Sequence, residues 1–135
     1  MRMRFLAYFY LPFYLLIVSS LSYALSNLKR GDSLSVEDDS DFITSPDNTF
    51  TCGFYAVGSN AYSFAIWFTD SKDRTVVWMA NRDRPVNGRG SKLSIWGNGA
   101  MVLTDVDGAI VWETNTTSTD IDKAELLNSG NLVLT

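Results

Sequence analysis

Beyond residue 24, short apolar runs alternate with clusters of Gly, Asn, Asp and Ser. Each run is long enough for a β-strand but too short for an amphipathic helix, and Asn, Asp and Gly tolerate the positive φ of tight turns. The pattern predicts an all-β domain of many short antiparallel strands. The expected strands are residues 34–36, 50–55, 63–69, 75–80, 92–96, 100–104, 110–114, 124–127 and 131–135.

The sequence also repeats itself. Residues 92–104 align without gaps on residues 123–135. The Val-Trp pairs that end at Trp78 and Trp112 form a second internal repeat. Each unit is a hairpin followed by a Val-Trp strand, which cannot bury its own apolar face, so several units must pack together. The bulk and the repeat position of the two tryptophans favour equivalent core anchors over ligand stacking.

The N-terminus has the organisation of a secretory signal peptide. Two arginines precede an apolar run over residues 5–18, and a small-x-small sequence ends at Ala24. A membrane anchor is the alternative, but a helix over this run reaches only roughly 21 Å, short of the ~30 Å hydrocarbon core. We expect cleavage after Ala24 and a secreted or cell-surface domain over residues 25–135.

The amino-acid composition disfavours several classes of partner and activity. The formal net charge is −4, which disfavours nucleic acid and anionic lipid as partners. There is no histidine, nucleophile elbow or kinase motif, so we expect no enzyme activity, no cofactor and no metal. The one cysteine, Cys52, lies in an apolar stretch and is expected to be a small buried residue, with a reactive thiol or a bond to a partner outside the chain as the alternatives.

Four stretches carry a family resemblance. The most specific is Val-Val-Trp-x-Ala-Asn-Arg-Asp-x-Pro within residues 75–85; the others are residues 50–55, 102–115 and 127–134. They resemble the bulb-type (monocot mannose-binding) lectin domain, and more closely the N-terminal ectodomain of plant S-locus glycoproteins and G-type lectin receptor-like serine/threonine kinases.

The resemblance implies a β-prism of three antiparallel four-stranded sheets with pseudo-threefold symmetry, placed outside the cell. The family continues the third repeat into another Val-Trp strand, so we expect this repeat to be incomplete and the chain to be truncated or part of a longer protein. Membrane attachment is expected only in such a longer form, and so is a kinase domain.

The resemblance also implies where sugar would bind. Each mannose site of the family uses Gln-x-Asp-x-Asn-x-Val-x-Tyr, whose alternate side chains share one face of a strand. The third repeat places Leu127, Ser129, Asn131, Val133 and Thr135 at these positions. Only Asn131 and Val133 match. A turn asparagine is the alternative role for Asn131, and Thr135 is expected to fray.

The other two repeats retain fewer of the family's sugar-binding residues. In the second repeat Val102 matches and Asn98 partly replaces the Asp, whereas the first repeat, aligned at residues 61, 63, 65, 67 and 69, has no match. Asp105-x-Asp107-Gly108 resembles the start of a calcium loop but is expected to be a hairpin turn. Asn115-Thr116-Thr117 is a glycosylation sequon in a polar run.

Three functions remain open. The favoured one is an extracellular recognition module with degenerate mannose sites that binds a cell-surface protein or a different glycan. The alternatives are an active mannose-binding lectin and a non-functional remnant. Because the third repeat lacks a closing strand, the apolar edge at Leu132 and Leu134 is expected to cause marginal stability or homo- or hetero-dimerisation.

Overall fold

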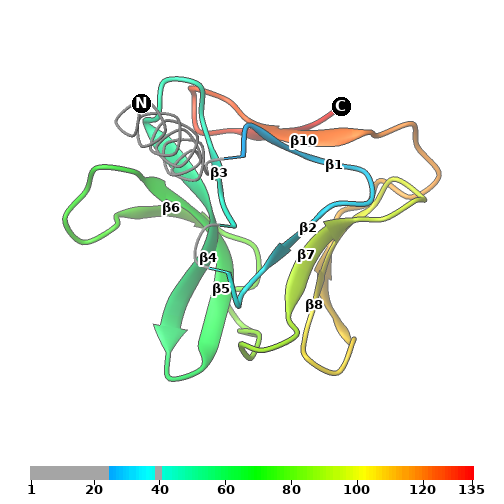
Figure 1. The fold of residues 1–135 in the computed structure, drawn as a ribbon, viewed down its shortest axis with the longest axis horizontal. Coiled ribbons are helices and arrows are strands. Elements are labelled where there is room, and N and C mark those ends of the chain that lie inside the picture. The colour runs from blue at the N-terminus through cyan, green and yellow to red at the C-terminus, as the bar shows by residue number, and fades with distance from the viewer. Residues whose placement is uncertain (1–24, 39–40) are drawn as a thin grey trace, which may run out of the picture.

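The computed structural model describes residues 25–38 and 41–135, and the strands of this part form three antiparallel sheets. The sheets surround a common centre like the sides of a prism (Figure 1). The all-β class and the β-prism are therefore confirmed. The expected signal peptide and its expected cleavage point at Ala24 lie outside the described residues. Within the described ranges there is no helix with the length and apolar character needed to span a bilayer.

The strands of each sheet run in the orders β3-β4-β5-β6, β2-β7-β8-β9 and β1-β10-β11. The first sheet contains β3 (Ile43–Thr44), β4 (Phe50–Gly58), β5 (Ala61–Phe68) and β6 (Val76–Met79). The second contains β2 (Ser33–Ser35), β7 (Lys92–Ile95), β8 (Met101–Thr104) and β9 (Ile110–Glu113). The third contains β1 (Asn27–Lys29), β10 (Lys123–Leu126) and β11 (Leu132–Leu134).

All nine expected strands are present. The sequence pattern did not predict β1 and β3, because strands of three and two residues carry too little apolar periodicity to be recognised. These two strands and β2 follow one another in the chain and supply the first strand of each sheet (Figure 1). They pair with β10, β4 and β7, respectively, so one N-terminal segment connects all three sheets.

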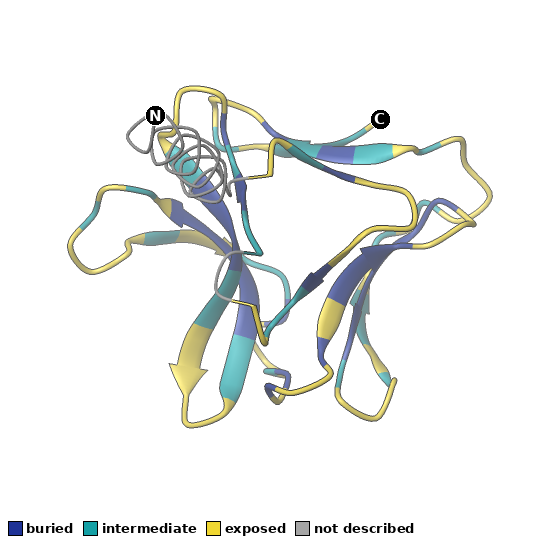
Figure 2. Ribbon diagram, in the orientation of Figure 1, coloured by how far each residue is buried: buried dark blue, intermediate teal, exposed yellow. Residues whose placement is uncertain are grey.

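The strand register reveals one repeated core layer. Across the second sheet Leu34, Leu93, Leu103 and Trp112 lie side by side. The matching rows are Ile43, Cys52, Ile66 and Trp78 in the first sheet and Leu28, Ala124 and Leu134 in the third. The members of these rows that belong to the first two strands of each sheet are fully buried, and Figure 2 shows buried positions along the inner faces.

Cys52 is one of these buried residues, as expected. It occupies the place that Leu93 has in the second sheet and Ala124 in the third. Burial raises the pKa of its thiol far above the ordinary value, because the thiolate would lose its hydration. Cys52 is therefore a small core residue, and the alternative of a reactive thiol is disfavoured.

The repeat at an offset of 31 also holds for the hydrogen bonds of the hairpin turns. Trp96 N donates to Ala100 O at 2.8 Å, and Leu127 N donates to Asn131 O at 2.9 Å. Gly99 and Gly130 end the two turns with φ of 91° and 88°, a region that favours glycine. The gapless sequence repeat is therefore a structural repeat.

The third sheet has three strands, and within the described residues β11 pairs only with β10. The predicted unpaired edge at Leu132 and Leu134 is thus present. Thr135 differs from the expectation of fraying. Its carbonyl oxygen accepts hydrogen bonds from the amides of Asp122 and Lys123, and its own amide donates to Lys123 O at 2.9 Å.

Candidate functional site

The third-repeat positions lie along β11 and the turn before it. The side chain of Asn131 is exposed and makes none of the hydrogen bonds found among the described residues, whereas Val133 is half-buried opposite Glu125. Ser129 accepts a hydrogen bond from Asn131 N at 3.4 Å. The five positions therefore hold one amide, the two hydroxyls of Ser129 and Thr135 and two apolar side chains, where the family pattern has four polar groups.

The turn that contains Ser129 is packed against the first sheet. A Cβ atom on Gly130 would lie 3.0 Å from the Phe50 ring, and Asn128 Oδ1 accepts a hydrogen bond from Asp47 N at 2.9 Å. The backbone of Asn131 closes the same turn through Leu127 N. These contacts favour the alternative role of Asn131, which is that of a structural residue at the end of the hairpin turn.

The second-repeat positions are engaged within the protein. Asn98 Oδ1 accepts a hydrogen bond from Ala100 N at 3.0 Å, so this oxygen is already used by the turn. Val102 is fully buried. The segment 114–122 lies against the turn, with Thr116 Oγ1 donating to Gly99 O at 2.8 Å and Ser118 N donating to Asn98 O at 2.8 Å.

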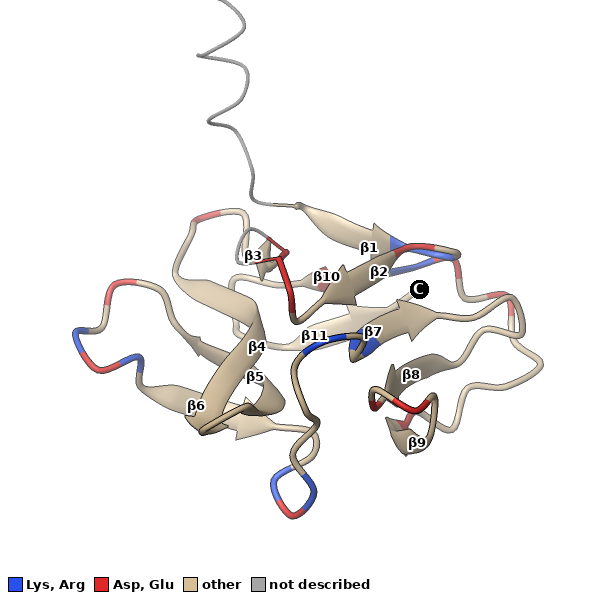
Figure 3. Cartoon of the chain, turned by 60° about the horizontal axis from the view of Figure 1, so that its bottom comes forward, with Lys and Arg blue, Asp and Glu red and all other residues tan. Residues whose placement is uncertain are grey.

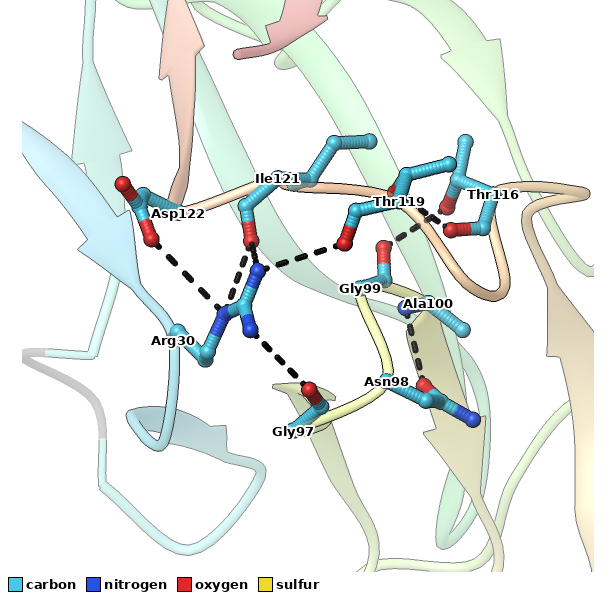
Figure 4. A network of polar contacts seen from close by, with 9 residues as sticks. All are labelled: Arg30, Gly97, Asn98, Gly99, Ala100, Thr116, Thr119, Ile121 and Asp122. Carbon is cyan, nitrogen blue, oxygen red and sulfur yellow. Dashed lines mark hydrogen bonds and ion pairs between the residues drawn. The ribbon is translucent and has the colours of Figure 1, made fainter.

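Arg30 fastens this segment in place (Figure 4). Its guanidinium donates from Nη1 to Gly97 O at 3.0 Å and from Nε to Ile121 O at 2.9 Å. Nη2 donates to Thr119 O at 3.4 Å, and Nε lies 3.8 Å from a carboxylate oxygen of Asp122. One side chain therefore holds the second-repeat turn and the segment 114–122 together, while Asn98 itself stays exposed.

Sequence reasoning missed Arg30. All but one of its contacts are to backbone carbonyl oxygens far along the chain, and such acceptors leave no trace in side-chain composition. The repeat at residues 92–104 pointed to the turn itself, but nothing in the sequence linked the turn to residue 30.

The first-repeat alignment was wrong by two residues. Ile66 faces Trp78 as Leu103 faces Trp112, so Ile66 corresponds to Leu103. The five positions are therefore residues 59, 61, 63, 65 and 67. The connection between β5 and β6 is longer than that between β8 and β9, and this difference displaced the alignment. Ser63 now takes the Asn position, and its buried hydroxyl has no hydrogen-bond partner in the structure.

An apolar groove of about 620 Å³ runs beside the open edge of β11. Trp78 and Trp112 line it together with Phe68, Leu132 and Leu134. Trp112 packs against the core as expected, but the side of Trp78 that faces the groove leaves this residue 37% exposed. The expectation of equivalent positions is confirmed, and that of a core anchor holds in part, since Trp112 is half-buried and packs against the core but also lines the groove.

The other sequence candidates have structural roles. Asp105 and Gly108 form the expected hairpin turn, in which Gly108 N donates to Asp105 O at 2.8 Å. Among the described residues no three His, Cys, Asp or Glu side chains are grouped so as to hold a metal ion. Asn115 is exposed at the start of segment 114–122. Figure 3 shows charges of both signs mixed on the connecting loops.

Comparison with known proteins defines the class. The mannose-specific agglutinin of snowdrop (Galanthus nivalis), solved with methyl-α-D-mannoside, superposes with a TM-score of 0.58 at 17% identity, over 82% of this chain and 89% of that chain. At this identity the similarity shows the fold, which is the bulb-lectin β-prism. A family model described as D-mannose binding lectin matches residues 75–135.

Sequence relatives narrow the class further. A receptor protein kinase of Zea mays is 39% identical over 127 residues, which are 89% of this chain and 16% of that protein. A G-type lectin S-receptor-like serine/threonine-protein kinase of Arabidopsis thaliana is 36% identical over 92% of this chain and 15% of its own length. The chain belongs to the bulb-type lectin family and is a lectin domain related to those of the G-type lectin S-receptor-like kinases. The matched region is a small, non-catalytic part of these relatives.

Proposed function

We propose that this chain is an extracellular recognition module that does not bind free mannose with useful affinity and instead binds a protein or a different glycan. The observation that carries the proposal is the state of the sugar positions. The third repeat retains one of four polar groups, and in the second repeat Val102 is buried and Asn98 Oδ1 already accepts a hydrogen bond from Ala100 N. Relatives that are receptor kinases support the extracellular placement.

The energetic reason is the number of missing contacts. Each neutral hydrogen bond contributes only about 0.5–1.5 kcal/mol net, so a sugar site needs several together. Leu127 offers nothing to a hydroxyl, Ser129 is shorter than Asp and uncharged, and Thr135 lacks the reach of Tyr. Losing three such contacts costs roughly 2–5 kcal/mol, or about 30- to several-thousand-fold in affinity.

Titration calorimetry with methyl-α-D-mannoside tests this proposal, with the snowdrop agglutinin as the positive control. The secreted protein should give no heat of binding at ligand concentrations of up to about 1 mM. The triple variant Leu127→Gln, Ser129→Asp, Thr135→Tyr restores the pattern and should gain measurable binding. Binding by the unaltered protein that Asn131→Ala abolishes would overturn the proposal and restore the mannose-lectin alternative.

Secretion and glycosylation belong to the same proposal. The signal-like residues 1–24 should be removed after Ala24, which Edman sequencing of the secreted product would reveal as an N-terminus at Leu25. The exposed Asn115 should carry a glycan, so deglycosylation should lower the mass of the protein and Asn115→Gln should remove that difference. A secreted product that retains Met1, or one whose mass does not change, contradicts the respective part.

A second role is self-association through β11. The strand has an unpaired edge beside an apolar groove, and such an edge is a template for another strand. Two copies can pair their β11 edges antiparallel about a twofold axis and cover part of both grooves. Sedimentation velocity should show a dimer that Leu134→Lys dissociates, whereas Val57→Lys on the exposed tip of β4 should have no effect. A stable monomer at all concentrations would refute this role.

A further inference from the structure

The outer face of the first sheet carries a second depression, separate from the apolar groove. It has a volume of about 680 Å³ and lies over the ends of β3, β4 and β5. Strand register places Thr44, Thr51 and Trp67 next to one another on its floor. This face is opposite to the one that carries Cys52 and Ile66, so the depression opens away from the core.

Its polar groups are held in place. Thr51 Oγ1 and Thr69 Oγ1 are 2.7 Å apart and share a hydrogen bond. On one wall Asp41 Oδ2 accepts a hydrogen bond from Ser35 N at 2.8 Å, which fixes the carboxylate, and no hydrogen bond from another described residue occupies its second oxygen. The depression thus combines hydroxyls that donate and accept with a carboxylate that accepts.

Trp67 and Arg74 form the rest of the depression on the first sheet. The Arg74 guanidinium carbon lies 5.6 Å from the centroid of the Trp67 ring, a cation–π geometry. A Cβ on Gly53 would lie 3.4 Å from the Trp67 ring, so the indole is held at its edge too and is only 8% exposed. None of the ion pairs among the described residues includes Arg74. Within residues 25–38 and 41–135, no carboxylate therefore neutralises its guanidinium through an ion pair.

The mixture of groups selects the ligand class. The carboxylates of Asp38 and Asp41 repel phosphates and uronates, and no group of three metal-binding side chains occurs in the described residues. A neutral ligand with several hydroxyls can donate to Asp41, accept from Arg74 and do both with the threonines. The volume lies in the ordinary range for small-ligand sites.

We infer that this depression is a binding site for a neutral oligosaccharide. It shares only Trp67 with the five family positions of the first repeat, and its other polar groups come from β3, β4 and the neighbouring loops. The inference rests on the proposed function in its glycan-binding form and supplies the surface that would carry it.

Saturation-transfer NMR on the secreted full-chain product tests the site. The probes are cellohexaose, β-1,4-mannohexaose and xyloglucan and arabinoxylan oligosaccharides, with oligogalacturonide and inorganic phosphate as charged comparators. At least one neutral oligomer should bind. Arg74→Gln and Thr51→Val should each weaken that binding by about tenfold, because each removes hydrogen bonds to the ligand. Arg82→Gln, which removes an exposed arginine outside the depression, is the matched control and should change nothing.

Near-ultraviolet circular dichroism of each variant separates loss of the site from loss of the fold. If a neutral oligomer binds equally well to folded Arg74→Gln, or if only oligogalacturonide or phosphate binds, the inference is wrong. It is also wrong if none of the neutral oligomers binds, although a protein ligand would then keep the proposed function intact. Binding of methyl-α-D-mannoside that depends on Asn131 would instead remove the proposed function.

Discussion

Trp78 and Trp112 meet edge to face with their ring centroids 5.9 Å apart, although they belong to different sheets. Both rings also contact Phe64, at centroid distances of 6.0 and 6.3 Å. Each tryptophan lies on the last strand of its sheet, and the third sheet contributes no equivalent ring from the described residues. The aromatic cluster therefore contains rings from two of the three sheets. The apolar groove lies at the place where a ring from the third sheet would complete the threefold arrangement.

The two tryptophans should differ in their contribution to stability. Trp112→Ala removes a half-buried ring that packs on the core and should lower the free energy of unfolding by about 3 kcal/mol, at the lower end of the usual cost of losing a buried aromatic. Trp78→Ala should cost roughly half as much, because part of its surface already meets solvent in the groove. Urea denaturation monitored by circular dichroism provides the comparison. Equal losses would show that the groove is filled in solution.

Arg30 should control how segment 114–122 packs against the second-repeat turn. Arg30→Lys keeps the charge but loses the forked donors that reach Gly97 O and Ile121 O together. We expect a stability loss of about 1–2 kcal/mol, since the guanidinium is partly exposed. Hydrogen exchange at Ser118 N should become faster, because its acceptor lies in the turn that Arg30 holds. Unchanged exchange would contradict the fastening role.

Asp105 should make stability depend on acid pH. Burial tends to raise the pKa of its carboxyl, but hydrogen bonds from the amides of Asn87 and Val106 outweigh burial, and the Ser91 hydroxyl acts in the same direction. The net pKa lies below the ordinary value of about 3.9. The stabilisation is therefore complete above that pH and is lost as the pH falls through the lower folded-state pKa.

Asp105→Asn should lower the free energy of unfolding at pH 7 by about 1 kcal/mol and flatten its decline below pH 4. Urea titrations at several pH values would measure both effects. Asp83→Asn, on an exposed loop, is the control and should leave the decline unchanged. The same decline in Asp105→Asn as in the parent would assign the acid sensitivity to other groups.

Cys52 should be inert to thiol reagents while the protein is folded, because burial raises the pKa of its thiol and denies access. Reaction with dithionitrobenzoate should proceed only at the rate of unfolding. Cys52→Ala should be tolerated at a cost of about 1 kcal/mol, since Ala124 fills the same place in the third sheet. Cys52→Ser should cost more, because its hydroxyl would be buried among apolar side chains. Rapid labelling of the folded protein would contradict this placement.

The sequence predicted the features that repeat. The offset between residues 92–104 and 123–135 became the same turn with the same hydrogen bonds, because a gapless repeat preserves register. Strands β1 and β3 were not predicted, since they are defined by their partners and not by their own composition. The first repeat was misaligned where an insertion lengthens the β5–β6 connection.

The sugar-binding positions also divide into features that the sequence predicts and features that only the structure reveals. The absence of the family's polar groups at Leu127, Ser129 and Thr135 could be read directly from the sequence. The docking of segment 114–122 on the second-repeat turn and the anchoring of Asn128 to the first sheet could not, because both depend on long-range contacts of backbone groups.

The N-terminal segment that connects all three sheets sets the order in which the chain can fold during synthesis. β3 leaves the ribosome only a few residues before β4, so the first sheet can begin to form early. β2 must wait for β7, and β1, which is made first, must wait longest because its partner is β10. The earliest strand thus waits longest for its partner, and the closure of the prism is a late, non-local event whose loop-closure entropy should make folding slow.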